Sequence, residues 1–256
     1  MERRLQRLRF PAGQTVSFAC NVNYLVMPLR QPAATSPSSA EGNTPAYHHG
    51  DLRNALIAEG RRQLDEVGAN DLSLRNLVRS IGVSIAAPAH HFGDKEGLLA
   101  AIATDGFHEL AALRRKIATE VKDPLQRALR IMECYVRFAE REKGLFMLMV
   151  GPQILKRPHK NLLDASTESF ALFAQAVQDY AIAKKWPESD LNLVVHAAWA
   201  TEHGLATLLL EHRAPFPRRK VDLEQMVHFS LNLLLSGISA GPSKHSVIAR
   251  QSLDGQ

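Results

Sequence analysis

The chain has 256 residues, of which 45% are hydrophobic, 22% charged and 6% aromatic. This composition suits a globular protein of one or two domains and disfavours aromatic-rich β-barrels. Its two cysteines, Cys20 and Cys134, exclude a disulfide framework and a CxxC metal or redox site, and they suit a reducing cytoplasm. The formal net charge is +5, but residues 47–104 carry six Lys or Arg against seven Asp or Glu, so charge alone does not establish nucleic-acid binding.

The first segment, residues 1–46, has no sustained hydrophobic period and ends in QPAATSPSSAEGNTP. Such a composition buries too little apolar surface to offset its ordering entropy, so we expect a disordered N-terminal extension. The basic start MERRLQRLRF also suits a targeting segment, although Gln14, Asn21 and Asn23 interrupt the apolar stretch that follows. Met27 is an alternative start, which N-terminal sequencing of the native protein would decide.

Residues 48–67 carry apolar side chains at helical spacing and predict one amphipathic helix, which Gly68 ends. Ser73 is placed to cap a short second helix. Gly82 ends that helix with a tight left-handed turn.

Residues 73–92, SLRNLVRSIGVSIAAPAHHF, have the spacing of a helix-turn-helix. Val83 is expected to hold the turn in the core, and Ser84 is placed to cap the next helix, at about 85–91. The small outer side chains and positive N-terminal end of that helix fit a major groove about 12 Å wide. Two short helices around a glycine also occur in many helical bundles, so the spacing alone leaves both interpretations open.

The rest of the chain is expected to be helical as well. Asp94 is placed to cap a long helix, and prolines separate the later periodic segments. Further helices are predicted at about 124–141, 143–151, 160–184, 189–212 and 220–239. We find no internal repeat, no sustained strand-like alternation and no apolar run of the ~18 residues that a membrane span needs. We therefore predict an all-α fold with a flexible tail at 241–256 and no membrane association.

Three successive stretches, YHHGDLRNALI, SLRNLVRSIGVS and HHFGDKEGLLAAIA, resemble the DNA-binding domain of TetR/AcrR-type transcriptional regulators without a gap over about 47–105. Downstream, WATEHGLA from Trp199 resembles the W-x-x-x-H-G (WHG-like) signature of one C-terminal ligand-binding subgroup of that family. The resemblance implies a helix-turn-helix DNA-binding domain at 47–104 and a helical ligand-binding and dimerisation domain at 105–240.

The resemblance also assigns DNA contacts to the recognition helix and its flanks. The implied contact residues are Ser84, Ile85, Ala86, Ala89, His90, His91, Lys95, Arg75 and His48. Family members commonly have a Tyr, which bonds to the DNA backbone, where this chain has Ala89. We therefore expect DNA binding that is weaker and more pH-sensitive than usual, because histidines supply part of the charge.

Residues 121–212 are rich in Met and Phe, which suits either a plain core or an adaptable apolar pocket. The implied ligand-binding residues are Met132, Phe138, Phe146, Phe170, Trp199 and His203. His203 is alternatively a packing residue beside Gly204. The apolar helices at about 189–212 and 220–239 carry more apolar surface than a hairpin needs, and in the family such a pair forms a four-helix homodimer interface.

The eleven histidines do not predict a metal site. Neighbouring histidines on a helix point about 100° apart, and His196 and His203 lie about 10.5 Å apart along the axis, too far for one zinc ion. Cys134 lies on an apolar helical face and is expected to be a core residue rather than a redox sensor. No catalytic or nucleotide-binding fingerprint is present, so we expect no enzyme, no metal and no cofactor.

Together these features predict a cytoplasmic, ligand-responsive transcriptional regulator. It would act as a repressor, bind a pseudo-palindromic operator in double-stranded DNA as a homodimer, and be released by a small apolar molecule. The alternative is an all-α dimer that senses a ligand or protein partner and has weak or lost DNA binding. Ala89 and the acidic balance of residues 47–104 favour that alternative.

Overall fold

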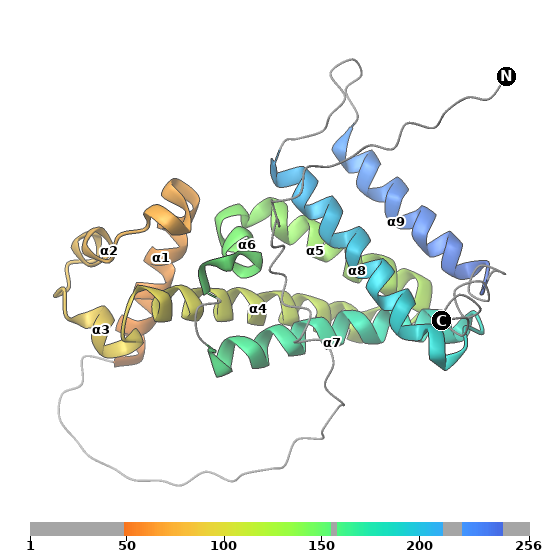
Figure 1. The fold of residues 1–256 in the computed structure, drawn as a ribbon, viewed down its shortest axis with the longest axis horizontal. Helices are drawn as coiled ribbons and strands as arrows, with labels where there is room; N and C mark the ends of the chain where they lie inside the picture. The colour runs from red at the N-terminus through yellow and green to blue at the C-terminus, as the bar shows by residue number, and fades with distance from the viewer. Residues whose placement is uncertain (1–48, 155–157, 212–221, 243–256) are drawn as a thin grey trace, which may run out of the picture. The chain divides into compact units, whose positions relative to one another are not determined.

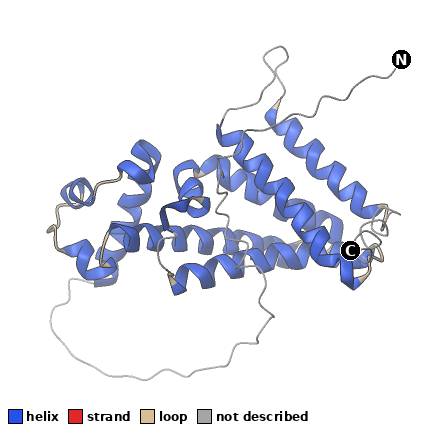
Figure 2. Ribbon diagram, in the orientation of Figure 1, coloured by secondary structure: helices blue, strands red, loops and turns tan. Residues whose placement is uncertain are grey.

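The computed structural model of the chain describes residues 49–154, 158–211 and 222–242. Every regular element in these ranges is a helix, and they contain no strand (Figures 1 and 2). The predicted all-α fold is confirmed. The predicted N-terminal extension, His48 and nearly all of the predicted tail lie outside the described residues.

The helices follow one another with short connections. In chain order they are α1 (His49–Asp71), α2 (Leu74–Ser80), α3 (Ala87–Phe92), α4 (Lys95–Glu120), α5 (Pro124–Arg141), α6 (Lys143–Val150), the 3-10 helix η2 (Pro152–Ile154), α7 (Lys160–Ala183), α8 (Glu188–Glu211) and α9 (Leu223–Ser239). Gly68 leaves the helical conformation within α1 (φ 74°, ψ 171°), so the first regular helix ends where the sequence predicted.

Side-chain caps fix where several of these helices begin. The Ser73 hydroxyl accepts a hydrogen bond from the Asn76 N–H (3.4 Å), and the Asp94 carboxylate accepts one from the Gly97 N–H (2.8 Å). These side chains satisfy backbone donors that have no partner inside the helix. The two predicted caps, at α2 and α4, are therefore confirmed.

The predicted cap of the recognition helix is wrong. The N-cap of α3 is Ala86, which makes no side-chain capping bond, and the helix starts at Ala87 rather than directly after Ser84. The physical reason is Pro88, whose missing N–H cannot bond to the Ser84 carbonyl as a helix beginning there would require. Instead, the Ala87 N–H donates to that carbonyl in a tight turn (3.1 Å).

Two apolar clusters hold the described helices together. The first joins α1, α2, α4 and α6 around side chains such as Leu56, Leu77 and Ile102, all fully buried. The second joins α5, α7, α8 and α9 around Phe173, Tyr180 and other buried side chains. Figure 1 shows α1, α2 and α3 beside the beginning of α4, while α7 runs along α4. The long helix α4 thus runs from the helix-turn-helix into the rest of this bundle.

One described helix, α8, passes a length-and-composition test for a membrane span over Glu188–Leu210, with a mean hydropathy of 1.2. A core helix of a helical bundle passes the same test, and α8 packs against α5, α7 and α9. The test is therefore weak evidence for a span.

Candidate nucleic-acid interface

The helix-turn-helix is held by its turn and by one carboxylate. Gly82 has φ 72°, a conformation that favours glycine, and the following Val83 donates its N–H to the Val78 carbonyl (3.0 Å) while packing against the first cluster. On α1, Glu59 accepts a hydrogen bond from the Ser80 hydroxyl at the end of α2 (2.6 Å). A hydrogen bond from Arg62 holds the pKa of the Glu59 carboxyl at about 2. These contacts fix α2 against α1.

The turn after Gly82 and the outer side of α3 form an exposed surface of small and apolar side chains. Its members, five of the predicted DNA contacts, are Ser84, Ile85, Ala86, Ala89 and His90. Ile85 is 62% exposed, which is unusual for a large aliphatic side chain next to a well-packed core. Small side chains let a helix approach a base edge closely, and an exposed Ile offers an apolar contact for a thymine methyl group.

The remaining predicted contacts lie around this surface. Arg75 is exposed on α2, and His91 is half-buried at the end of α3. The half-buried Lys95 ammonium donates to the Asn70 carbonyl (2.8 Å), which ties the start of α4 to the end of α1. Because an ammonium has three donors, this bond leaves Lys95 able to reach a phosphate as well.

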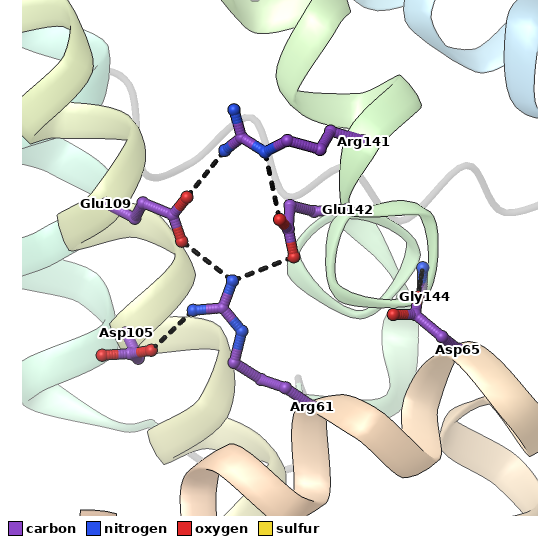
Figure 3. A network of polar contacts seen from close by, with 7 residues as sticks. All are labelled: Arg61, Asp65, Asp105, Glu109, Arg141, Glu142 and Gly144. Atoms are coloured by element: carbon purple, nitrogen blue, oxygen red, sulfur yellow. Dashed lines mark hydrogen bonds and ion pairs between the residues drawn. The ribbon is translucent and has the colours of Figure 1, made fainter.

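Behind the helix-turn-helix, a network of ion pairs joins α1 to α4 and to the start of α6 (Figure 3). The Arg61 guanidinium contacts Asp105 (2.9 Å), Glu109 (2.8 Å) and Glu142 (3.0 Å). Arg141 bonds to Glu109 (2.7 Å) and Glu142 (3.1 Å), which closes the network. We call these five residues the Arg61 network.

The electrostatics of the Arg61 network favour its charged state. Burial alone would lower the pKa of Arg61, but hydrogen bonds to its three carboxylate partners raise it above its usual value. Burial alone would raise the pKa of Glu142, but hydrogen bonds from Arg61 and Arg141 outweigh burial and lower it. Arg61 and Glu142 therefore stay ionised around neutral pH.

Next to this network, α6 begins directly against the backbone of α1. The Gly144 N–H donates to the Asp65 carboxylate (2.9 Å), as Figure 3 shows. A Cβ atom at Gly144 would lie 2.6 Å from the Leu64 carbonyl carbon, closer than real Cβ atoms approach backbone. Only glycine permits this close contact, and α1 and α6 are thereby joined.

The six predicted ligand-binding residues do not form one group. Trp199 stacks on His203 (ring centroids 5.4 Å apart, planes 20° apart), and Phe146 lies 6.3 Å from the same imidazole. Met132 and Phe138 are fully buried in different apolar clusters. Phe170 packs on Phe173, with ring centroids 5.6 Å apart. The structure thus brings three of the six together.

Sequence reasoning missed Tyr135, whose hydroxyl lies 2.9 Å from the His203 Nδ1 atom. Burial lowers the pKa of His203, which favours the neutral imidazole. Together with Phe146 and Trp199, these residues form what we call the Tyr135–His203 group. It combines aromatic surface with two polar atoms, a composition that binding sites for small apolar molecules share.

A buried contact between an arginine and a glutamate beside this group was also missed. Arg114 and Glu202, 3% and 1% exposed, are joined at 2.9 Å, and Arg114 lies over the rings of Tyr135 and Phe173. Among the residues that the structure describes, the Nε of Arg114 and the Oε2 of Glu202 find no hydrogen-bond partner. Burial raises the pKa of the Glu202 carboxyl to about 8, although Arg114 partly opposes the shift. Arg114 and Glu202 each lie on an otherwise apolar face of a helix. This sequence pattern could have indicated that both residues are buried.

No metal site is found among the residues that the structure describes, where no three His, Cys, Asp or Glu side chains are grouped to hold an ion. Cys134 is half-buried, and burial raises the pKa of its thiol. A protonated thiol is a weak nucleophile, which fits the predicted packing role.

Two protein-family models match separate parts of the chain. Residues 56–102 match the model of the TetR family of bacterial regulatory proteins, and residues 128–234 match a tetracyclin repressor-like C-terminal domain. The fold and these matches define a helix-turn-helix transcription regulator with a helical C-terminal domain, a class of DNA-binding proteins rather than enzymes. The two models together match more than half of the chain, and the protein belongs to the TetR family.

Individual relatives agree in fold. A protein with unknown function from a Rhodococcus species is 30% identical, with 77% of this chain and 100% of that chain covered and a TM-score of 0.65. The TetR family transcriptional regulator PfmR from Thermus thermophilus is 23% identical, with 71% and 97% covered and a TM-score of 0.52, a likeness of fold alone.

A curated relative, the nucleoid occlusion factor SlmA from Vibrio vulnificus, is 34% identical over 94 residues. The match covers 34% of this chain and 45% of SlmA, so it spans less than half of that protein. The WHG-like subgroup suggested by the sequence is not among these matches.

Proposed function

We propose that the protein is a cytoplasmic, homodimeric repressor that binds a pseudo-palindromic operator and is released by a small molecule. The observation that supports the proposal is the exposure of all five predicted contacts of the turn and α3. The proposed DNA-binding domain is residues 47–104 and the ligand-binding and dimerisation domain is 105–240, with α4 crossing the boundary.

On this proposal, α3 enters the major groove. Ala86 and Ala89 permit close approach, and Ile85 contacts base methyl groups. The basic side chains of Arg75, His90, His91 and Lys95 bind phosphates, and so does that of His48, which lies outside the described residues. Because histidines supply part of this charge, operator binding is more sensitive to pH than usual.

The proposed dimer interface is the outer side of α8 and α9. Leu193 and Leu208 on α8 and Phe229 and Leu233 on α9 are between 45% and 68% exposed. Gly204, on the same side of α8, has nothing within 4 Å of where a Cβ would lie. Such an apolar, partly small-residue surface suits close packing against the same helices of a second chain.

For release, we propose that an apolar ligand binds at the Tyr135–His203 group. The group includes Phe146, which lies on α6, and α6 is joined to α1 at Gly144. A shift of α6 would therefore move the helix-turn-helix of each subunit and spoil its match to two half-sites. A coupling of about 1–3 kcal/mol is enough to change operator affinity about 5–150-fold.

The alternative is a dimeric sensor that has lost useful DNA binding. The exposed Ala89, which offers no phenol to a phosphate, is the observation that favours it. Footprinting on the DNA upstream of the protein's own gene separates the two functions. Two protected half-sites about one helical turn apart support the repressor, whereas no protection at low salt supports the sensor.

A further inference from the structure

A cavity of about 310 Å³ lies where the end of α3 meets the beginnings of α4 and α7. Its lining includes Arg53 from α1, Phe92 from α3, Thr104 from α4 and Leu162 from α7. None of the six predicted ligand residues lines it, and of the predicted DNA contacts only His91 does. It is therefore separate from the Tyr135–His203 group.

Basic side chains from three helices and the residue before α7 converge on this cavity. They are Arg53, His91, His159 and Lys160. No acidic side chain is among the described residues that line it. Glu96 bonds to His159 (3.3 Å) and Asp164 to Lys160, so two acids outside the lining partly balance the charge. The Arg53 guanidinium lies 5.6 Å from the centre of the Phe92 ring, a cation–π contact between two lining residues.

The rest of the lining is apolar and small. Phe92, Ala100, Ala101 and Leu162 provide it, next to Gly97. The volume is at the lower end of the range for small-molecule sites, about 300–1,000 Å³. A cavity with cations at one part and aliphatic and aromatic surface at another suits a compact molecule that carries one acidic group.

We propose that this cavity binds a small organic anion, with its carboxylate or phosphate held by Arg53 and Lys160 and its apolar part against Phe92 and Leu162. The bound anion would contact the recognition helix directly, because Phe92 is the last residue of α3. It is an additional effector site beside the apolar-ligand site of the proposed function. The effect of the anion on DNA binding rests on the proposed function, but binding of the anion to the cavity does not.

Isothermal titration calorimetry of the full chain without DNA tests binding. The probes are two aromatic anions, phenyl phosphate and phenylacetate. Phenol is the control for an aromatic ring without a charge, and inorganic phosphate is the control for an anion without a ring. We expect at least one of the two aromatic anions to bind at millimolar concentration or below, more tightly than phenol or inorganic phosphate. Which one binds tells whether the acid is a phosphate or a carboxylate.

Two variants locate the site. The double variant Arg53→Gln/Lys160→Gln should weaken binding about tenfold or more, because it removes both charged partners. Ala101→Leu keeps every charge but fills part of the cavity and should weaken binding too. The matched control is Arg115→Gln/Lys116→Gln, which removes two charges from the distal half of α4, away from the cavity lining, and should leave binding unchanged.

Equal weakening in the site and control pairs would show general charge attraction and overturn the proposal. So would the absence of binding by both aromatic anions, or phenol binding as tightly as they do. Circular dichroism confirms that each variant is folded. A protein that bound no DNA would still give the calorimetric result, so failure of the proposed function is distinguishable from failure of this site.

Discussion

The backbone N–H of Gly144 donates a hydrogen bond to the Asp65 carboxylate, so α6 begins on the first helix of the DNA-binding domain. The contact is short because residue 144 has no Cβ to separate it from the Leu64 backbone. Gly144 thus lies against α1 through both the Asp65 side chain and the Leu64 backbone. The first prediction tests this contact, and the second tests the Arg61 network next to it.

Gly144→Ala should strain or break the close contact between α1 and α6. The added methyl group would lie 2.6 Å from the Leu64 carbonyl carbon, so α1 and α6 must separate. We expect a loss of about 1–3 kcal/mol in the free energy of unfolding, measured by urea denaturation. Gly237→Ala is the control, since nothing lies within 4 Å of its Cβ position. An equally stable Gly144→Ala protein would contradict the close contact.

Arg61→Gln should destabilise the protein by about 1–3 kcal/mol, because it leaves partly buried carboxylates without their charged partner. Arg115→Gln removes one exposed ion pair, with Glu168, and should change stability by less than about 0.5 kcal/mol. Thermal denaturation of both variants at low and high salt measures the difference. If the two substitutions lower the stability by the same amount, Arg61 contributes no more to stability than an exposed charged side chain does.

Glu202→Gln should flatten the dependence of stability on pH. With the pKa of Glu202 raised from 4.5 to about 8, the folded state holds a proton that the unfolded state has lost. The free energy of unfolding of the wild type should therefore fall as pH rises through this window, by at most about 1.4 kcal/mol per pH unit.

The informative range for this measurement is pH 6.5 to 8. The lowered pKa of His203 has the opposite effect, since stability is lost as pH falls below its usual value of 6.5. Denaturation at several pH values should give a negative slope in the wild type and a smaller one in Glu202→Gln. Glu168→Gln, at an exposed position, should keep the wild-type slope, and identical slopes in all three proteins would exclude Glu202 as the source.

Ala89→Tyr should strengthen operator binding. Ala89 is exposed on α3, and a phenol there adds a hydrogen-bond donor for a DNA phosphate. One such bond is worth about 1 kcal/mol, or roughly a fivefold gain in affinity. Fluorescence anisotropy with a labelled operator measures it at fixed salt, with the exposed Ala112→Tyr on α4 as the control. A gain in both variants would point to non-specific binding.

Phe229→Glu/Leu233→Glu should dissociate the proposed dimer. Both side chains are more than 60% exposed in the single chain, and two charges would have to be buried on association. Analytical ultracentrifugation should show a monomer, while Ile182→Glu, an equally drastic change on α7, should remain dimeric. A dimeric double variant would place the interface elsewhere.

Local signals made most of the fold predictable. Ser73 and Asp94 cap their helices within three residues, and Pro124 stands at the first position of α5. Such signals act between near neighbours and are visible in sequence. The start of α3 was misplaced because two local rules conflict there, and the missing N–H of Pro88 outweighs the capping tendency of Ser84.

The contacts that join distant helices could not be predicted in the same way. Arg61 pairs with residues 44 to 81 positions away, and on α1 alone it resembles any solvated charge. Arg114 and Glu202, 88 positions apart, gave a clearer signal, because each follows an apolar residue of its face by four positions. The signal marks each of them as buried but does not say which charge is its partner.

If the exposed apolar side of α8 and α9 is the dimer interface, as we propose, the response also depends on the amount of protein. Only a dimer would then bind both half-sites. As long as most subunits are monomeric, operator occupancy therefore rises with the square of the protein concentration. A modest decrease in synthesis of the protein would then lower operator occupancy more steeply than it would for a protein that binds as a monomer.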